Sequence, residues 1–112
     1  MVATLEGYDL VCKVSEMPPR GKKKLSVSGI DILIIACESG YYAIQDRCPQ
    51  TARPISHGKV LNCQLTSPHT GAHYDLRTGK YVGGGQSPLQ SHWLTVLPLR
   101  VVDEDIYVQV TR

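Results

Sequence analysis

Two short loops of this 112-residue chain carry the side chains that could bind a metal or take part in redox chemistry. The first loop contains Cys48-Pro49-Gln50, and the second contains Ser67-Pro68-His69-Thr70-Gly71. Between and beside them lie Cys63, His57 and His73. Thiolate and imidazole are the donors that zinc sites and iron–sulfur centres use in proteins. This segment therefore holds the candidate functional site.

The elements that position these loops are predicted to be strands. Short apolar runs separated by Gly, Pro, Ser or Asp recur along the chain, and no window has the period of an amphipathic helix. Residues 32–37 form the longest apolar run, which has the length of a strand. Ser28-Gly29 predicts a two-residue hairpin turn. Residues 93–102 are predicted to form one strand. Residues 83–85, three glycines, predict a flexible crossover. The fold class indicated is all-β, a small sandwich or barrel.

One domain is expected over residues 1–112, which is an ordinary length for a single domain. Core strands are predicted in residues 8–45 and 83–112. The segment between them, residues 46–82, is rich in Gly, Pro, His and Cys and is predicted to form an inserted subdomain.

Composition narrows the range of partners. Charged residues make up 20% of the chain and the formal net charge is +2, which does not favour nucleic acid or a membrane as a partner. No apolar run is long enough to span a bilayer and no signal peptide is evident, so a cytoplasmic protein with reduced cysteines is expected.

Cys12 and Cys37 are interpreted as small core residues. The chain has one basic cluster, Arg20, Lys22, Lys23 and Lys24. We interpret it either as a solvated loop or as a docking patch for an acidic protein.

Both loops and their flanks resemble the Rieske family. The stretches that carry the resemblance are AIQDRCPQTARPISHGKV, LTSPHTGAHYDLRTGKYVGGG and LTVLPLRVVDEDIYVQV. They are similar to the ferredoxin components of aromatic-ring dioxygenases, whose motif is Cys-x-His, a spacer, and Cys-x-x-His. The resemblance implies an antiparallel β-sandwich of the Rieske type with an inserted cluster-binding subdomain.

In this family two cysteines hold one iron of a [2Fe–2S] cluster and two histidines hold the other. Carried over in register, the resemblance puts Cys48 at the first cysteine, Gln50 at the first histidine, Ser67 at the second cysteine and Thr70 at the second histidine. A slip that made His69 the ligand would need an insertion and a compensating deletion. Three of the four ligands are therefore replaced, and we expect these positions to be vestigial and no cofactor or metal to be bound.

Four alternatives stay open for the remaining side chains. A rearranged [2Fe–2S] centre or a zinc site could use Cys48 and Cys63 with His57, His69 or His73, although no tight C-x2-C pair is present. Cys48 beside a histidine could be a nucleophile. Otherwise the histidines make hydrogen bonds and the cysteines stay reduced. We further hypothesise that the polar replacements hydrogen-bond across the gap between the loops.

The function predicted from this pattern is that of a non-catalytic accessory or interaction subunit of an oxidoreductase system. The alternative is a small electron-transfer ferredoxin of a multicomponent oxygenase with an atypical iron–sulfur centre. In both cases the partner is a protein, an oxygenase or reductase component. The resemblance places the contact surface at the loop tip, with Arg53, His57 and His69 as its polar anchors.

Overall fold

The computed structural model describes residues 7–17, 21–48, 53–68, 70–85 and 93–110. Its elements are strands and one short 3-10 helix, so the predicted all-β class is confirmed. In chain order they are β1 (Asp9–Lys13), η1 (Val14–Glu16), β2 (Lys22–Val27), β3 (Ile30–Cys37), β4 (Gly40–Gln45), β5 (Lys59–Leu61), β6 (Gln64–Thr66), β7 (Ala72–Asp75), β8 (Tyr81–Gly84), β9 (Val96–Leu97), β10 (Leu99–Val102) and β11 (Asp105–Val108).

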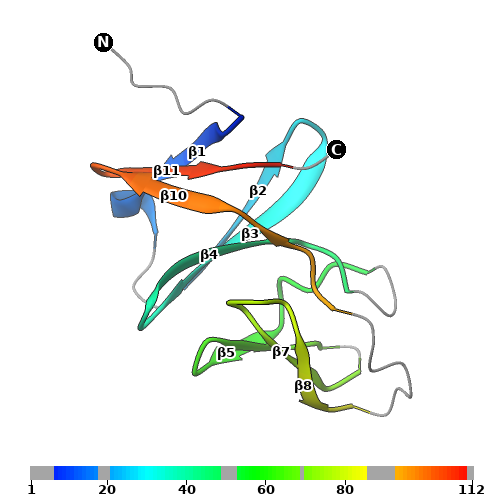
Figure 1. Ribbon diagram of the computed structural model, residues 1–112. Coiled ribbons are helices and arrows are strands. Elements are labelled where there is room, and N and C mark those ends of the chain that lie inside the picture. The colour runs from blue at the N-terminus through cyan, green and yellow to red at the C-terminus, as the bar shows by residue number, and fades with distance from the viewer. Residues whose placement is uncertain (1–6, 18–20, 49–52, 69, 86–92, 111–112) are drawn as a thin grey trace.

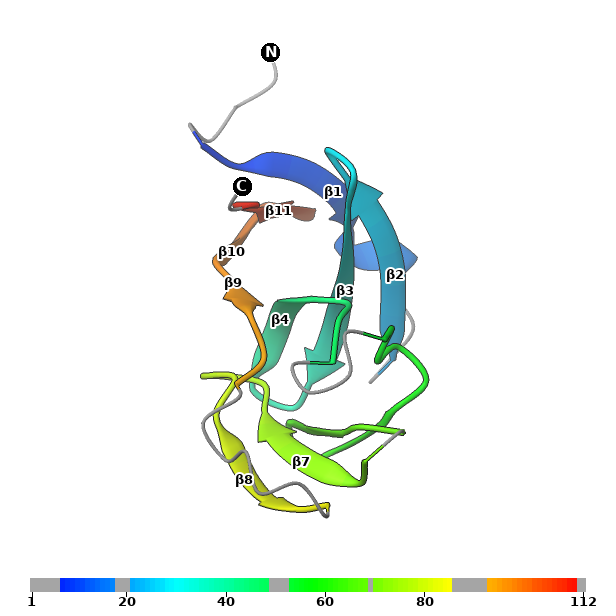
Figure 2. The ribbon, with the colours of Figure 1, turned by 90° about the vertical axis from the view of Figure 1, so that its right-hand side faces the viewer.

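The strands form three antiparallel sheets. The first has the order β1-β11-β10, the second, central sheet has the order β2-β3-β4-β9, and the third has the order β5-β6-β7-β8. Figures 1 and 2 show the third sheet at one end of the molecule, on the far side of the central sheet from β1 and β11. Among the described residues there is no helix that is both long and apolar enough to span a membrane.

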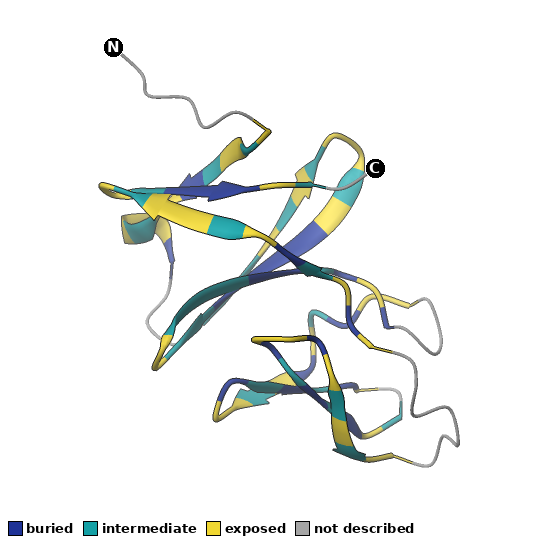
Figure 3. Ribbon diagram, in the orientation of Figure 1, coloured by how far each residue is buried: buried dark blue, intermediate teal, exposed yellow. Residues whose placement is uncertain are grey.

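Strand β3 is the centre of the fold because both of its faces are buried. Leu33 and Ile35 pack in an apolar cluster shared with the third sheet, whereas Ile32 and Ile34 pack in a second cluster shared with β1 and β11. Successive side chains of a strand point to opposite faces, so a continuous apolar run can fill two cores at once. Figure 3 shows the resulting buried stretch of β3 between exposed turns. The predicted Ser28-Gly29 hairpin turn is confirmed, with φ of 52° and 80°.

The chain changes sheets at Pro98. Residues 93–102 were expected to form a single strand, and this prediction is wrong: β9 pairs with β4 in the central sheet, and β10 pairs with β11 in the first. Proline has no N–H to donate to a strand ladder, so the pairing is interrupted there. The Pro98 carbonyl still accepts a bond of 2.9 Å from the Gln109 N–H.

Two of the three consecutive glycines lie in a strand, so the predicted flexible crossover is wrong for them. Gly83 and Gly84 belong to β8 and pair with β7. A Cβ atom on Gly84 would lie 2.6 Å from the His73 ring and 2.7 Å from the Gly71 carbonyl oxygen, and its φ is 76°. Glycine is therefore required because β8 passes so close to its neighbour.

Polar contacts fix the loop between β4 and β5 against the central sheet. The buried Asp46 carboxylate accepts a 2.8 Å bond from the Ile55 N–H and lies 3.2 Å from the Lys24 ammonium. The Lys22 ammonium donates a 2.7 Å bond to the Ser56 carbonyl. Two lysines of the basic cluster, Lys22 and Lys24, therefore tie this loop, the first of the two site loops, to strand β2.

Candidate functional site

Cys48 points inward from the first loop. Its side chain has 0% exposed area and belongs to the apolar cluster between the central and third sheets. The Cys48 N–H donates a 2.7 Å bond to the Arg53 carbonyl, which closes the loop on itself. Burial of this thiol is therefore set by the loop backbone and by the Asp46 contacts just before it.

Ser67 points inward from the second loop, directly after β6. Its N–H donates to the Ala72 carbonyl at 2.8 Å, its carbonyl accepts from the Gly71 N–H at 3.0 Å, and its side chain is 1% exposed. Gly71 has φ of 77°, which a glycine adopts without strain. The Thr70 Oγ1 atom accepts a 3.2 Å bond from the Ala72 N–H, so its oxygen caps the same turn.

The two loops meet at these buried side chains. Cys48 Sγ and Ser67 Oγ lie 3.6 Å apart, within hydrogen-bonding distance for sulfur. Ser67 thus bridges to the facing loop, whereas the Thr70 bond described above lies within its own loop. Gln50, the third polar replacement, and His69 lie outside the described residues.

Tyr74 of β7 brings a buried hydroxyl close to Cys48. Burial raises the pKa of Tyr74 to about 12, and the neighbouring Cys48 and Tyr81 add to the increase. Its hydroxyl has no hydrogen-bond partner among the described residues. The ring packs edge-on against Tyr81, with centroids 6.1 Å apart. A neutral donor is therefore buried beside the one cysteine that keeps its place in the motif.

The described donors do not fit the ligand set of a Rieske cluster. Cys48 offers a thiol, but Ser67 and Thr70 offer hydroxyl oxygens where the family has thiolate and imidazole. Hydroxyl oxygen is a harder donor than thiolate and suits iron–sulfur centres less well. The Thr70 oxygen already accepts a backbone N–H.

The other predicted site residues are dispersed. Arg53 and His57 are exposed on the loop between β4 and β5. His73 Nδ1 is hydrogen-bonded to Thr66 Oγ1 at 2.7 Å across the β6–β7 pair. Within the part of the chain that the structure describes, no three His, Cys, Asp or Glu side chains are close enough to hold a metal ion.

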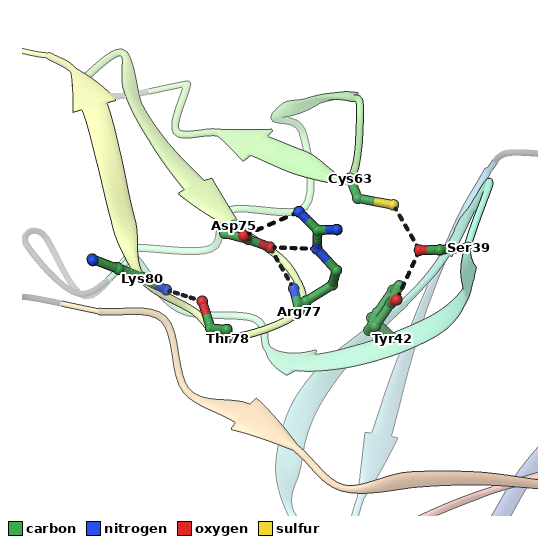
Figure 4. A network of polar contacts seen from close by, with 7 residues as sticks. All are labelled: Ser39, Tyr42, Cys63, Asp75, Arg77, Thr78 and Lys80. Atoms are coloured by element: carbon green, nitrogen blue, oxygen red, sulfur yellow. Dashed lines mark hydrogen bonds and ion pairs between the residues drawn. The ribbon is translucent and has the colours of Figure 1, made fainter.

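Cys63 belongs to a different group of side chains, which the sequence did not predict. Its thiol lies 3.6 Å from Ser39 Oγ and within hydrogen-bonding distance of the Cys37 thiol. The Arg77 guanidinium lies nearby and pairs with Asp75 at 3.2 Å, as Figure 4 shows. These contacts join residues far apart in the chain. The only local signal for them is a cysteine in a two-residue hairpin turn, where glycine is the usual residue.

Known proteins support the resemblance over nearly the whole chain. The family model for a Rieske-like [2Fe–2S] domain matches residues 7–109. The chain is 31% identical over 103 residues to the 3-phenylpropionate/cinnamic acid dioxygenase ferredoxin subunit of Photorhabdus laumondii, and the match covers 90% of this chain and 92% of that protein.

Two solved structures share the fold. A chain in the complex of reduced oxygenase and oxidized ferredoxin in carbazole 1,9a-dioxygenase matches with a TM-score of 0.79 and 22% identity, covering 94% of each chain. A 2-oxoquinoline 8-monooxygenase component with a Rieske [2Fe–2S] centre matches with a TM-score of 0.83 and 19% identity, covering 94% of this chain but 26% of that one. The predicted Rieske-type fold is confirmed.

The family match corrects one prediction. The protein was expected to bind no cofactor, because three of the four cluster-ligand positions are replaced. That expectation is wrong for this family, since its model describes a [2Fe–2S] domain and the curated relative is a ferredoxin subunit. The strand order, the two facing loops and a match to residues 7–109 lead to one assignment: this chain belongs to the family of Rieske-like [2Fe–2S] domains.

Proposed function

We propose that this protein is the ferredoxin component of a multicomponent oxygenase and that its iron–sulfur centre uses a donor set different from the usual one. The observation that carries the proposal is the extent of the match. The chain covers 92% of a dioxygenase ferredoxin subunit but 26% of an oxygenase component. The chain is 31% identical to that ferredoxin subunit over 103 residues, and we infer from this likeness the non-catalytic role of a small electron carrier.

Cys48 is the residue proposed to hold the centre. When bound, a [2Fe–2S] centre supplies a site for accepting and releasing an electron. Cys48 is buried against apolar side chains that keep water away from its sulfur. The Tyr74 hydroxyl is protonated at neutral pH, and its raised pKa of about 12 keeps it protonated in alkaline solution as well, so it can donate a hydrogen bond to sulfur.

The proposed partner is an oxygenase or reductase component that docks on the loop tip. Arg53 and His57 are exposed there and can offer polar contacts. The similar carbazole dioxygenase structure holds oxygenase and ferredoxin in one complex. None of the four cysteines, all of which lie in the described part of the chain, forms a disulfide, which suits the reducing environment of the cytoplasm, the proposed location.

Iron and sulfide analysis tests the proposal. Protein made anaerobically with ample iron is expected to contain about two irons per chain and to absorb visible light. Cys48→Ala should lose the iron, whereas Cys12→Ala, a matched buried thiol in the other apolar cluster, should keep it. Colourless wild-type protein without iron or sulfide would overturn the electron-transfer proposal.

Colourless protein without iron would favour a second candidate function, that of an accessory subunit of an oxidoreductase. One observation supports this candidate: the bond between Cys48 and Ser67 joins the two loops directly through protein side chains. An accessory subunit would still bind its oxidoreductase partner in a pull-down without transferring electrons to it. A ferredoxin would do both.

Restoring the ligands tests the register of the motif. The triple change Gln50→His, Ser67→Cys and Thr70→His is expected to give the absorption and electron paramagnetic resonance spectra of a cysteine- and histidine-ligated [2Fe–2S] centre. The closeness of Cys48 and Ser67 supports this placement. If the folded variant takes up no iron and sulfide while the wild type does, the assignment of these positions is wrong.

A further inference from the structure

The turn between β5 and β6 holds a cysteine in an unfavourable backbone conformation. Leu61 pairs with Gln64, so Asn62 and Cys63 form a two-residue hairpin turn with φ of 54° and 57°. This geometry is that of a type I′ turn, which favours Asn followed by Gly. Asparagine tolerates the left-handed region, but a cysteine there is strained. Such strain is kept where the side chain has another role.

The side chain of Cys63 is surrounded by hydrogen-bond donors from the β3–β4 turn. The Ser39 hydroxyl lies 3.6 Å from its sulfur, and hydrogen bonding from the Cys37 and Ser39 side chains and from the backbone of Glu38 and Ser39 lowers the pKa of Cys63. The Arg77 guanidinium adds a positive charge nearby. Figure 4 shows Cys63 directed at Ser39, with the Arg77 side chain beside it. Such an environment stabilises a thiolate.

The two thiols differ in acidity. Burial alone would raise the pKa of Cys63, but the hydrogen bonds from Cys37, Ser39 and the turn amides outweigh it and lower the pKa below the ordinary value. Burial, followed by the hydrogen bond to Cys63 and its charge, raises the pKa of Cys37 to about 12. Cys63 is therefore the better nucleophile, and Cys37 is the proton donor held against it.

A pocket adjoins both cysteines. Cys37 and Cys63 line a pocket of about 140 Å³ between the end of β3 and the β5–β6 hairpin. Cys12 and Cys48 belong to the two apolar clusters. The pocket is large enough for a molecule the size of hydrogen peroxide.

We propose that Cys63 and Cys37 are a hydroperoxide-reactive thiol pair that forms a reversible disulfide. The Cys63 thiolate attacks one oxygen of hydrogen peroxide, the O–O bond breaks, and the leaving hydroxide takes a proton from solvent, which received one when Cys63 ionised, to become water. Cys63 is now a sulfenic acid. The Cys37 sulfur then attacks the Cys63 sulfur and loses its proton, and the hydroxide displaced from the sulfenic acid takes up that proton to become a second water.

The balance is a two-electron oxidation of two thiols by one peroxide. The product links the end of β3 to the β5–β6 turn, and thus the central sheet to the third sheet. A cellular dithiol reverses it by thiol–disulfide exchange. The pair is separate from Cys48 and Ser67, so this proposal stands without the one for electron transfer.

Peptide mapping after peroxide treatment tests the pair. The full-length protein is treated with a small excess of hydrogen peroxide, alkylated with iodoacetamide, digested and analysed by mass spectrometry. The expected product is a disulfide between the Cys37 and Cys63 peptides, with Cys12 and Cys48 still alkylated. Cys37→Ser should leave a sulfenic acid on Cys63 that dimedone traps, and Cys12→Ser should behave as the wild type.

A measurement on the wild type alone guards against variants that fail to fold. Near neutral pH, iodoacetamide should alkylate Cys63 at least about tenfold faster than Cys37, because the thiolate fraction changes about tenfold for each pKa unit. Equal alkylation rates, a disulfide that involves other cysteines, or sulfenic acid that forms first on Cys48 would overturn the proposal.

Discussion

The central sheet and the third sheet bury their strands by different means. β3 of the central sheet has four consecutive apolar residues that are almost fully buried, residues 32–35, and these side chains contact other apolar side chains on both faces. β7 of the third sheet alternates buried residues with partly exposed polar ones, and His73 and Asp75 bond to other side chains. The central sheet is specified by the packing of apolar side chains. The third sheet depends on hydrogen bonds and backbone angles, and the residues proposed to carry chemistry lie beside it.

The largest effect is expected from a cavity in the central sheet. Ile34 has 0% exposed area between β3 and the first sheet. Ile34→Ala should lower the free energy of unfolding by about 2–5 kcal/mol, because the lost apolar contacts leave a cavity. Urea denaturation followed by circular dichroism measures the change. Val82→Ala, an exposed position on β8, is the control and should change stability by less than about 0.5 kcal/mol.

A smaller loss is expected where polar contacts hold the first site loop. Asp46→Ala removes the acceptor of the Ile55 N–H and the partner of Lys24. The expected loss is about 2 kcal/mol, since a hydrogen bond to a charged group contributes about 1.5–3 kcal/mol and the ammonium is half exposed. Asp46→Asn keeps an acceptor for the N–H and should lose less. Equal losses in the two variants would show that the ion pair dominates.

The sequence predicted the parts of the fold that depend on local patterns. The continuous apolar run of β3 and the Ser28-Gly29 turn are readable from residue types alone. The interruption at Pro98 was missed, although proline is a local signal, because the flanking residues are apolar on both sides. The strand character of Gly83 and Gly84 was missed because glycine has low strand preference, and only the close approach of the His73 ring requires it.

Only one of the two side-chain groups, the one at Cys48 and Ser67, was predictable from the sequence. Motif spacing in the family resemblance put Cys48 and Ser67 on two loops, and the structure brings them together. The contact between Cys37 and Cys63 is different, since it joins two strand ends that are distant in sequence. Neither residue has a spacing that indicates a pair. Such a contact follows from the packing of the third sheet on the central one, which a single sequence does not specify.

Replacing two cysteines by glycine compares the two regions directly. Cys12→Gly in β1 should cost about 2 kcal/mol, because it removes a buried side chain and places glycine in a strand. Cys63→Gly removes a thiol of similar burial but relieves a left-handed residue, which returns about 1–2 kcal/mol. The reduced Cys63→Gly protein should therefore unfold within about 1 kcal/mol of the wild type. A loss as large as that of Cys12→Gly would mean that the Cys63 contacts outweigh the strain.

The smallest effect is expected at the surface of the third sheet. Hydrogen bonds from Arg77, and then its charge, lower the pKa of the Asp75 carboxyl below its ordinary value, despite partial burial. A carboxyl whose pKa is lowered by folding stabilises the protein above its unfolded pKa, and this stabilisation is lost as the pH falls through its folded pKa. Asp75→Asn keeps the acceptor for the Arg77 N–H but removes the charge. Thermal unfolding should show the wild type slightly more stable near neutral pH, with the difference vanishing in acid and shrinking in high salt. A difference that stays constant with pH would show that turn geometry, rather than charge, is what Asp75 contributes.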